Sequence, residues 1–574
     1  MIQDVYEPLD EYVSTYRDKF KQVAEDTFNE LAKEAGVDAE HNRKTCEQLY
    51  QFGKDADALD KKITWWKLLR DLLWIIIAVG LYFILFKMQE YPTWQIVIIG
   101  IVAFVTLVIL FWKVRPRIKR MKKDHEDINA AKKKLEDDAW EQMQPLNALY
   151  DWDVFTRIMS RTIPRLEFDP FFTTQRLADL QNTYGWNDSF NKERSVVYSH
   201  SGLINGNPFV ICRTKKMEMG TKTYHGELEI RWETVEQDID GSYQTKKHSE
   251  TLRASVDAPY PEYFEKTRLI YGNTAAPDLT FSRDKAEMKE GSLAYKWERR
   301  KLRKKSQDLT GSDYAMMTNE EFEVMFNTSD RNNNQQFALL FTPLAQENIL
   351  KLLRDEEVGF GDDFTFVKNK MINTITPDHL QELDLDMHPD VFYDFDFDKA
   401  RANFIETNAV YFRSIYFSLA PLLSVPLYQQ IRPVEAIYGR DMKKHSSFWE
   451  HEALANFWGN DKFKHPECVT DCILKTEETF NQGDSSVIDV SAHGFRAVQR
   501  VTYVKKYGKD GNWHDVPVYW DEYLPVVGKG VMQISEDNQP EKADATNTDR
   551  LQRRVELLNL SDYQVYRRHI ASKV

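Results

Sequence analysis

Two stretches of the sequence gather side chains that could bind a metal ion. In the first, histidines and cysteines fall close together at His445, His451, His465, Cys468 and Cys472. Zinc favours such ligands, but the spacing His-x2-Cys-x3-Cys is not a usual zinc pattern. His465, Cys468 and Cys472 are therefore candidate zinc ligands, and packed interior side chains beside the neighbouring aromatic residues are the simpler alternative.

The second stretch, residues 384–398, reads DLDMHPDVFYDFDFD. Dense carboxylates can coordinate a hard divalent cation, which makes Asp394, Asp396 and Asp398 candidate ligands. An EF-hand loop requires a glycine at its sixth position and a late glutamate, and this stretch has neither. The alternation of aromatic residues and aspartates in residues 393–398 predicts a strand with a solvated carboxylate face, which needs no metal.

No catalytic constellation can be recognised from residue spacing. The sequence shows no Ser-His-Asp or Cys-His arrangement that stands out. It also lacks the phosphate loop GxxxxGK[ST] and the dinucleotide fingerprint GxGxxG. We therefore assign no catalytic residue and no cofactor, and favour a protein that is not an enzyme.

Two apolar segments lie between residues 64 and 113. They are uncharged over residues 72–86 and 94–112. A hydrocarbon core about 30 Å thick requires about 20 helical residues. The second segment is long enough alone, and the first is extended by apolar residues from Trp65 onward, among which Lys67 and Arg70 can snorkel to the headgroups. This pattern predicts a two-span transmembrane hairpin. A buried hairpin in a soluble core is disfavoured, because core helices are seldom apolar on every face.

The charges that flank these segments predict an orientation. Basic residues precede the first span, and a denser group follows the second: Lys113, Arg115, Arg117, Lys119, Arg120, Lys122 and Lys123. The connecting residues 87–93 contain one basic residue, Lys87. By the positive-inside rule both termini are cytoplasmic, in a cell membrane with an anionic inner leaflet. Residues 1–20 are charged, so no cleavable signal peptide is expected.

Composition narrows the classes of partner and the compartment. The net charge of -14 over 574 residues argues against general nucleic-acid binding. Four cysteines in so long a chain do not form a disulfide framework, so a reducing compartment is expected. The expected partners are the lipid bilayer and an unidentified protein, and a homo-oligomer is left open.

Helical periodicity continues on both sides of the apolar segments. Residues 1–63 and 114–150 are predicted to form cytoplasmic helices that extend the two spans as an antiparallel stalk, with Pro116 kinking one arm. Coiled-coil oligomerisation is one interpretation of this stalk. Packing within the chain is favoured, because the apolar stripe is short and broken.

Residues 151–376 are predicted to form an α+β domain. Alternating residues between 195 and 272 predict an antiparallel meander divided at residues 205–207, at Gly220 and at residues 240–241. A basic helix is expected at residues 294–309. Its cations suit phospholipid headgroups, although a solvated face or an RNA or acidic protein partner remain alternatives. The membrane-surface candidates in this helix are Arg299, Arg300, Lys301, Arg303, Lys304 and Lys305.

Residues 320–376 resemble part of a known family. A strand is expected at residues 322–326, a second at 337–341, a helix from Pro343 and a further strand at 364–372, with Phe337, Leu339, Phe341 and Leu352 in the core. The residues Phe322-Glu323, Phe326, Ser329, Gln336 and Leu340-Phe341-Thr342-Pro343 resemble bacterial membrane proteins with the domain of unknown function 3137. The resemblance covers at most residues 60–376. It implies two spans before a cytoplasmic domain and implies no active site.

Residues 377–535 are predicted to form a second α+β domain or to continue the first. The apolar residues 409–428 are expected in its core, with an interfacial segment as the alternative. A β-hairpin is expected to turn at residues 508–511. Residues 536–574 are predicted to be a flexible linker and a terminal amphipathic helix that includes Leu551, Val555 and Leu558.

Together these patterns predict an α+β protein. An N-terminal helical stalk and a two-helix transmembrane hairpin, residues 64–113, precede a cytoplasmic region of antiparallel sheets and packed helices. The favoured function is a membrane-anchored scaffold, or protein-interaction module, at the inner leaflet. A membrane-bound metal-dependent hydrolase is the alternative. An oligomeric channel or transporter component is third, weakened by the lack of ionisable residues inside the uncharged runs, residues 72–86 and 94–112.

Overall fold

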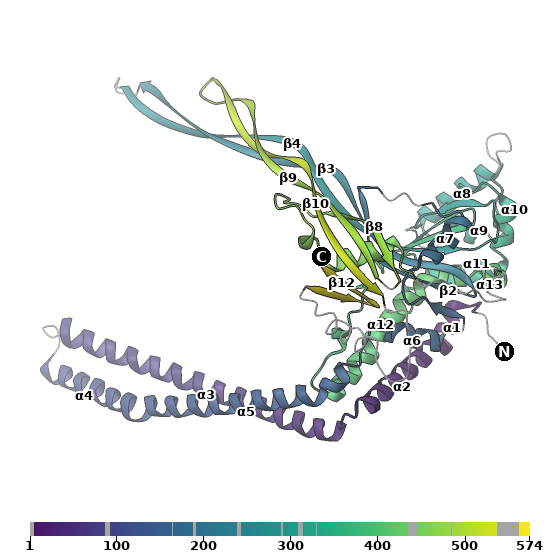
Figure 1. Ribbon diagram of the computed structural model, residues 1–574. Coiled ribbons are helices and arrows are strands. Elements are labelled where there is room, and N and C mark those ends of the chain that lie inside the picture. Colours follow the sequence, from purple (N-terminus) through teal and green to yellow (C-terminus); the bar gives the residue numbers. More distant parts are fainter. Residues whose placement is uncertain are drawn as a thin grey trace. The chain divides into compact units, whose positions relative to one another are not determined.

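The computed structural model describes the chain except for residues 1–4, 87–91, 164, 188–190, 238–242, 287, 289–290, 308–313, 329, 434–444, 484, 537–561 and 574. Two long apolar helices near the N-terminus are followed by antiparallel sheets and packed helices, which confirms the predicted α+β class (Figure 1). The chain forms two compact units. We call Met1–Ala24, Asp151–His388 and Thr407–Val574 the sheet unit, and Glu25–Tyr150 with Pro389–Glu406 the helical unit.

The helical unit is built on long helices. After α2 (Arg17–Ala35), α3 runs unbroken over Ala39–Phe86, followed by α4 (Thr93–Ile109) and α5 (Arg115–Asn147). The predicted stalk is present, since α3 packs along both α4 and α5. A π-helical turn, η2 (Leu110–Val114), leads into α5 just before Pro116, whose missing N–H disfavours regular helix at this point. Association of copies through the stalk stays a prediction.

A seven-stranded antiparallel sheet forms one half of the sheet unit. Its strand order is β1-β2-β3-β4-β7-β6-β5. The strands are β1 (Leu166–Phe168), β2 (Arg194–Ile204), β3 (Asn207–Gln237), β4 (Tyr243–Gly272), β5 (Thr280–Arg283), β6 (Phe364–Asn369) and β7 (Ile372–Pro377). The predicted meander is confirmed at the turn of residues 205–207, and the division expected at residues 240–241 lies outside the described chain. The break expected at Gly220 is wrong. Gly220 lies within β3 and pairs with Tyr260, because one long strand continues past it.

A five-stranded antiparallel sheet forms the other half. Its order is β11-β12-β10-β9-β8. The strands are β8 (Ile473–Gln482), β9 (Ser485–Tyr507), β10 (Trp513–Glu536), β11 (Tyr563–Tyr566) and β12 (His569–Lys573). The predicted hairpin at residues 508–511 joins β9 to β10. The predicted terminal helix is wrong over residues 563–573, where β12 pairs with β10, and its remaining residues lie outside the described chain.

The remaining elements of the chain are short helices, apart from α12. They are α1 (Pro8–Glu11), η1 (Tyr12–Tyr16), α6 (Val154–Thr162), α7 (Thr174–Asn182), α8 (Leu293–Gln307), α9 (Glu320–Phe326), α10 (Asn334–Leu340), α11 (Pro343–Arg354), η3 (Pro389–Phe392), α12 (Phe397–Leu423), α13 (Pro426–Gln430), α15 (Phe448–Trp458) and η4 (Asn460–Lys462). Most apolar side chains of residues 409–428 are buried, which confirms the core prediction for this segment.

The two strands expected at residues 322–326 and 337–341 are helices, α9 and α10. Asn319 accepts a hydrogen bond from the backbone N–H of Phe322, and Asn333 accepts one from Gln336, so each helix has an asparagine N-cap. Short apolar runs do not distinguish strand from helix. Phe337, Phe341 and Leu352 are buried, as predicted. The core prediction for Leu339 is wrong, because the helical spacing leaves its side chain 59% exposed.

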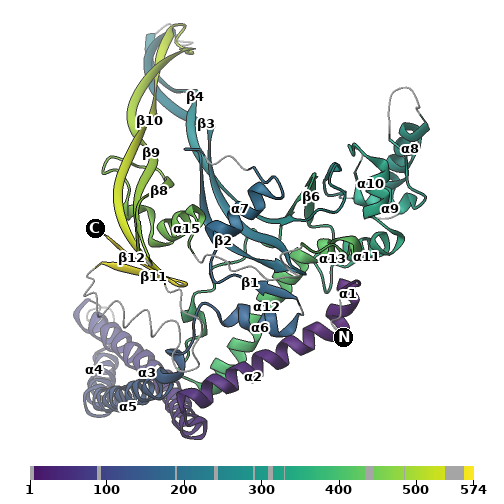
Figure 2. The same ribbon diagram turned by 45° about the vertical axis from the view of Figure 1, so that its right-hand side comes forward.

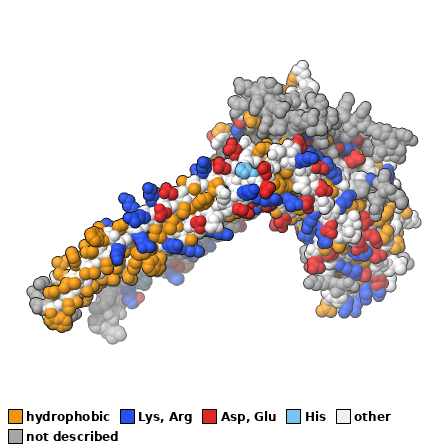
Figure 3. All heavy atoms as spheres, turned by 90° about the horizontal axis from the view of Figure 1, so that it is seen from below, with side chains coloured by type: hydrophobic (Ala, Val, Ile, Leu, Met, Phe, Trp, Pro, Cys, Tyr) orange, Lys and Arg blue, Asp and Glu red, His pale blue; other side chains and the backbone are white. Residues whose placement is uncertain are grey.

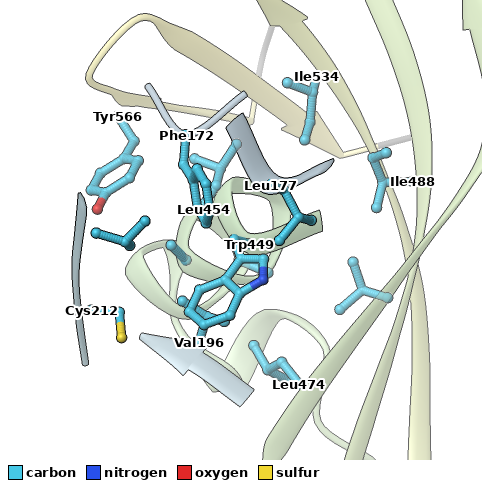
Figure 4. Close-up of a cluster of buried hydrophobic side chains, with 14 of the residues drawn as sticks. Phe172, Leu177, Val196, Cys212, Trp449, Leu454, Leu474, Ile488, Ile534 and Tyr566 are labelled. Carbon is cyan, nitrogen blue, oxygen red and sulfur yellow. The ribbon is translucent and has the colours of Figure 1, made fainter. Parts of the chain in front are cut away.

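The main core of the sheet unit surrounds α15 (Figure 4). Trp449 packs against Phe172 and Trp186 at ring-centroid distances of 5.6 and 5.1 Å. Leu454 from the same helix and Ile488 from the second sheet belong to this cluster. The helix therefore joins the two sheets through buried apolar surface, the dominant favourable term in folding.

Two long hairpins, β3–β4 and β9–β10, run side by side beyond the sheets (Figure 2). We call them the paired arms. They pack through a small apolar cluster of Ile230, Leu252, Ala254, Val516 and Val518. An isolated two-stranded hairpin is marginal in water, so the two hairpins stabilise each other.

Gly226 in β3 permits the close approach of the arms. A Cβ built at Gly226 would collide with the backbone carbonyl of Pro517, whereas one at Gly220 would meet only the end of the flexible Glu262 side chain. We expect Gly226→Ala to lower the free energy of unfolding by about 1–3 kcal/mol, because rigid backbone must move. Urea denaturation measures this loss, and Gly220→Ala is the matched control. An equal effect of the two substitutions would contradict the packing described.

Candidate membrane anchor

The hairpin of α3 and α4 exposes apolar side chains on a scale unusual for a water-facing surface. The described residues contain two helices that are long and apolar enough to cross a membrane, and only 11% of each apolar window is buried. A core helix of a soluble protein would be mostly buried. Figure 3 shows the apolar side chains gathered along the projecting helices, next to a band of Lys and Arg. The most exposed include Leu68, Ile75, Leu85, Phe86, Trp94, Phe104 and Trp112.

The two apolar helices pack closely against each other. A Cβ at Gly80 of α3 would lie 3.2 Å from the Cβ of Ala103 in α4, so small residues bring the backbones together. Ile77 and Leu110 are buried. The hydroxyl of Thr106, in the second apolar segment, is buried and donates to the carbonyl of Val102 at 2.7 Å. The side chains named here are therefore suited to the apolar interior of a membrane.

Cations and aromatic rings meet where the apolar segments end. The Arg115 guanidinium lies 4.3 Å from the ring centroid of Phe111 and 5.8 Å from that of Trp74. Arg117 lies 5.2 Å from the ring of Trp66. Tryptophan and arginine are typical of the boundary between hydrocarbon and headgroups. Because Trp66 and Trp74 are eight residues apart, these contacts extend over about 12 Å of α3.

The predicted basic residues after the second span form one exposed group, which we call the basic collar. All seven are exposed: Lys113, Arg115, Arg117, Lys119, Arg120, Lys122 and Lys123. The two apolar segments are long enough to cross a bilayer, since residues 65–86 and 94–112 span about 33 and 28 Å at 1.5 Å per residue. The arrangement can insert into a bilayer and hold cations at its headgroups.

The aspartates proposed as metal ligands have other uses. The Asp396 carboxylate accepts hydrogen bonds from the backbone of Asp398 and Lys399 and so caps α12, and it accepts one from the Tyr50 hydroxyl at 2.6 Å. Asp398 forms an ion pair with Arg43 at 2.8 Å. The strand expected at residues 393–398 is wrong, because these residues form the turn and cap that begin α12.

The candidate zinc ligands are only partly brought together. The Sγ atoms of Cys468 and Cys472 lie 3.6 Å apart, while His465 Nδ1 accepts the backbone N–H of Glu467. Among the residues that the structure describes, no three His, Cys, Asp or Glu side chains form a group that could hold a metal ion. The two thiols are buried, as the alternative of packed interior side chains expects.

A network of buried charged groups surrounds α15 in the sheet unit. The Glu450 carboxylate accepts hydrogen bonds from Phe172 N at 2.8 Å and Ser199 Oγ at 3.2 Å, and pairs with Arg567 at 3.3 Å. Burial raises the pKa of Glu450, and Arg567 opposes that shift. Glu450 and Arg567 are 1% and 4% exposed, so a substrate cannot reach them and the network is structural.

Glu452, also on α15, is buried and forms an ion pair with Lys475 of β8, whose side chain is 21% exposed. Glu452 also accepts the backbone N–H of Val196 at 2.9 Å. Burial raises the pKa of Glu452 to about 7, although Lys475 acts in the opposite direction. Neither pair was predicted from the sequence. Their signal was the run Glu450-His451-Glu452 inside an otherwise apolar helix, where charged residues are buried only when paired.

His569 offers a prediction about pH. Its ring packs 4.9 Å from that of Phe171, and neither ring nitrogen has a hydrogen-bond partner among the described residues. Burial lowers its pKa to about 3, so the folded state binds its proton less readily than the unfolded chain. Its stabilising contribution is present above the unfolded pKa of 6.5 and is lost as the pH falls from there towards 3.

We expect His569→Phe to remove this acid sensitivity. The free energy of unfolding of the variant relative to the natural protein should rise by about 2 kcal/mol between pH 7 and pH 5, since one pKa unit corresponds to 1.4 kcal/mol. Urea denaturation at both pH values measures the difference, with the exposed His225→Phe as control. A difference that does not change with pH would show that His569 is not held neutral in the fold.

The fold and the site define an α+β protein with two helices that are long and apolar enough to cross a membrane. Comparison with family models, with curated proteins and with solved structures finds no match to this chain. The assignment therefore depends on the residues described above.

Proposed function

We propose that this chain is a membrane-anchored cytoplasmic scaffold. The observation that carries the anchor is the exposed apolar hairpin that ends at the basic collar. Cations on that side favour retention in the cytoplasm, so the hairpin enters and leaves the bilayer from the cytoplasmic face, with both termini in the cytoplasm. Relationship to the bacterial proteins with the domain of unknown function 3137 is part of the same proposal.

The paired arms support the scaffold role. Four aromatic side chains on one face of the β9–β10 hairpin, Tyr503, Tyr507, Trp513 and Tyr519, are each more than half exposed, at 63%, 59%, 68% and 57%. Exposed apolar patches of this kind are typical of protein-interaction surfaces, in which Tyr and Trp are enriched. The proposed partner is therefore a protein that covers this aromatic face.

The outer face of the other arm differs and provides a control. There the strands carry cross-strand polar pairs, such as Arg253 with Glu227 and Thr223 with Asp257. These groups satisfy one another along this face. Loss of binding through the aromatic face, with retention of binding when the polar face is changed, would be specific for the scaffold role.

The test is purification of the full chain in a gentle detergent, with mass photometry, mass spectrometry and metal analysis. The proposal expects one protein in a fixed molar ratio, lost in Tyr503→Ser/Tyr519→Ser and retained in Thr223→Ser/Thr251→Ser. A bare monomer with a stoichiometric divalent metal ion would contradict the scaffold and favour the hydrolase. Ion flux through liposomes that contain the protein would favour the channel.

A further inference from the structure

The basic helix predicted at residues 294–309 is present as α8, which ends at Gln307, and residues 308–309 lie outside the described chain. The cations of α8 divide into two groups by the direction in which they point. At about 100° per residue, Leu293, Trp297, Arg300 and Lys304 lie within about 60° of one another on the helix surface. All four are exposed. The opposite side carries Tyr295 and Leu302, which are buried. The helix therefore has one face against the protein and one against its surroundings.

Cations near the protein side have protein partners. Arg303 and Arg299 pair with Glu320 at 2.6 and 4.0 Å. The side chains of Arg300 and Lys304, and that of Lys296 beside them, form no ion pair within the described part of the chain. The outward charge is therefore not neutralised by described residues of this protein.

Two large apolar side chains lie on this cationic face. Leu293 is 85% exposed and Trp297 is 65% exposed. A basic helix that faces only water needs neither of these side chains, and their exposure to water is unfavourable. A helix that lies in a membrane interface shows this combination, with cations for the headgroups and Trp and Leu for the boundary with the acyl chains.

We infer that the outward face of α8 binds the surface of an anionic phospholipid membrane. The inference depends on the proposed anchor, which keeps the sheet unit tethered to such a surface and so raises the effective concentration of lipid. Each cation near an anionic leaflet adds to the attraction. RNA is disfavoured as the occupant because the chain carries a net charge of -14 and this face offers a single ring for base stacking.

The experiment uses the full chain in lipid nanodiscs with an environment-sensitive dye on Leu293→Cys. The four native cysteines are buried, so labelling is selective. We expect a blue shift of the dye in phosphatidylserine discs, little shift in phosphatidylcholine discs, and reversal by high salt. Arg300→Glu/Lys304→Glu should abolish the shift. Neither side chain has an ion pair among the described residues, so α8 should stay helical, which circular dichroism checks.

A dye on Ser249→Cys, an exposed position in β4, is the matched control and should not respond to lipid charge. If the chain enters both kinds of disc and the dye on residue 293 does not respond, the inference about α8 is wrong and the anchor stands. Failure of the chain to enter any disc would instead overturn the anchor. A shift caused by single-stranded RNA but not by anionic lipid would also overturn the inference.

Discussion

Val79→Arg/Ile101→Arg should release the protein from membranes. Val79 and Ile101 are 49% and 58% exposed on the two apolar helices, so neither arginine would disturb a packed protein interior. In a bilayer, however, each arginine near the centre of a span costs about 2.5–3.5 kcal/mol on insertion scales. We expect most of the variant to leave the membrane fraction on carbonate extraction, while the natural protein stays in the pellet.

The matched control for this release is Val235→Arg. Val235 is 65% exposed in the arm of the sheet unit, so the substitution adds positive charge without entering a bilayer. It should fractionate as the natural protein does. If carbonate extraction released the natural protein from the membrane fraction, the hairpin would not span a membrane.

Arg567→Met should cause a large loss of stability in the sheet unit. The substitution leaves the Glu450 carboxylate buried without its charged partner, which costs about 3–5 kcal/mol. The midpoint of urea denaturation of the full chain in detergent measures the loss. Arg567→Met/Glu450→Gln should recover part of the stability, since removal of a whole buried pair costs less than removal of one partner.

A surface ion pair provides the comparison for Arg567. Arg496 pairs with Glu467 at 3.0 Å, with side chains 45% and 58% exposed. Arg496→Met should therefore change the free energy of unfolding by less than about 1 kcal/mol. Equal effects at Arg567 and Arg496, or no recovery in the double variant, would contradict the role assigned to the buried pair.

The two apolar helices could be predicted from the sequence because their signal is local. An uncharged run such as residues 94–112 is long enough to identify the helix without knowledge of its neighbours. The basic helix α8 and the hairpin at residues 508–511 were likewise predictable, from a run of cations and from turn residues between alternating strands. In each case the feature depends on residues adjacent in sequence.

The buried network and the C-terminal strands depend on distant residues. Arg567 meets Glu450 across 117 positions, and nothing around either residue indicates the other. The strand β12 is buried because β10 pairs with it, not because of its own short pattern. Similarly, Asp396 resembled a metal ligand until its role as the cap of α12 was visible. Such contacts require the folded chain.

The most direct test of the anchor is the accessibility of residue 90, between the two apolar segments, in intact cells. With Glu90→Cys, the four native cysteines are buried and give little background. A membrane-impermeant maleimide should label Glu90→Cys in intact cells, and should label Ser249→Cys, placed in the sheet unit, only after the cells are opened. Protection of residue 90 in intact cells, or equal labelling of residue 249, would contradict a two-span anchor with a cytoplasmic sheet unit.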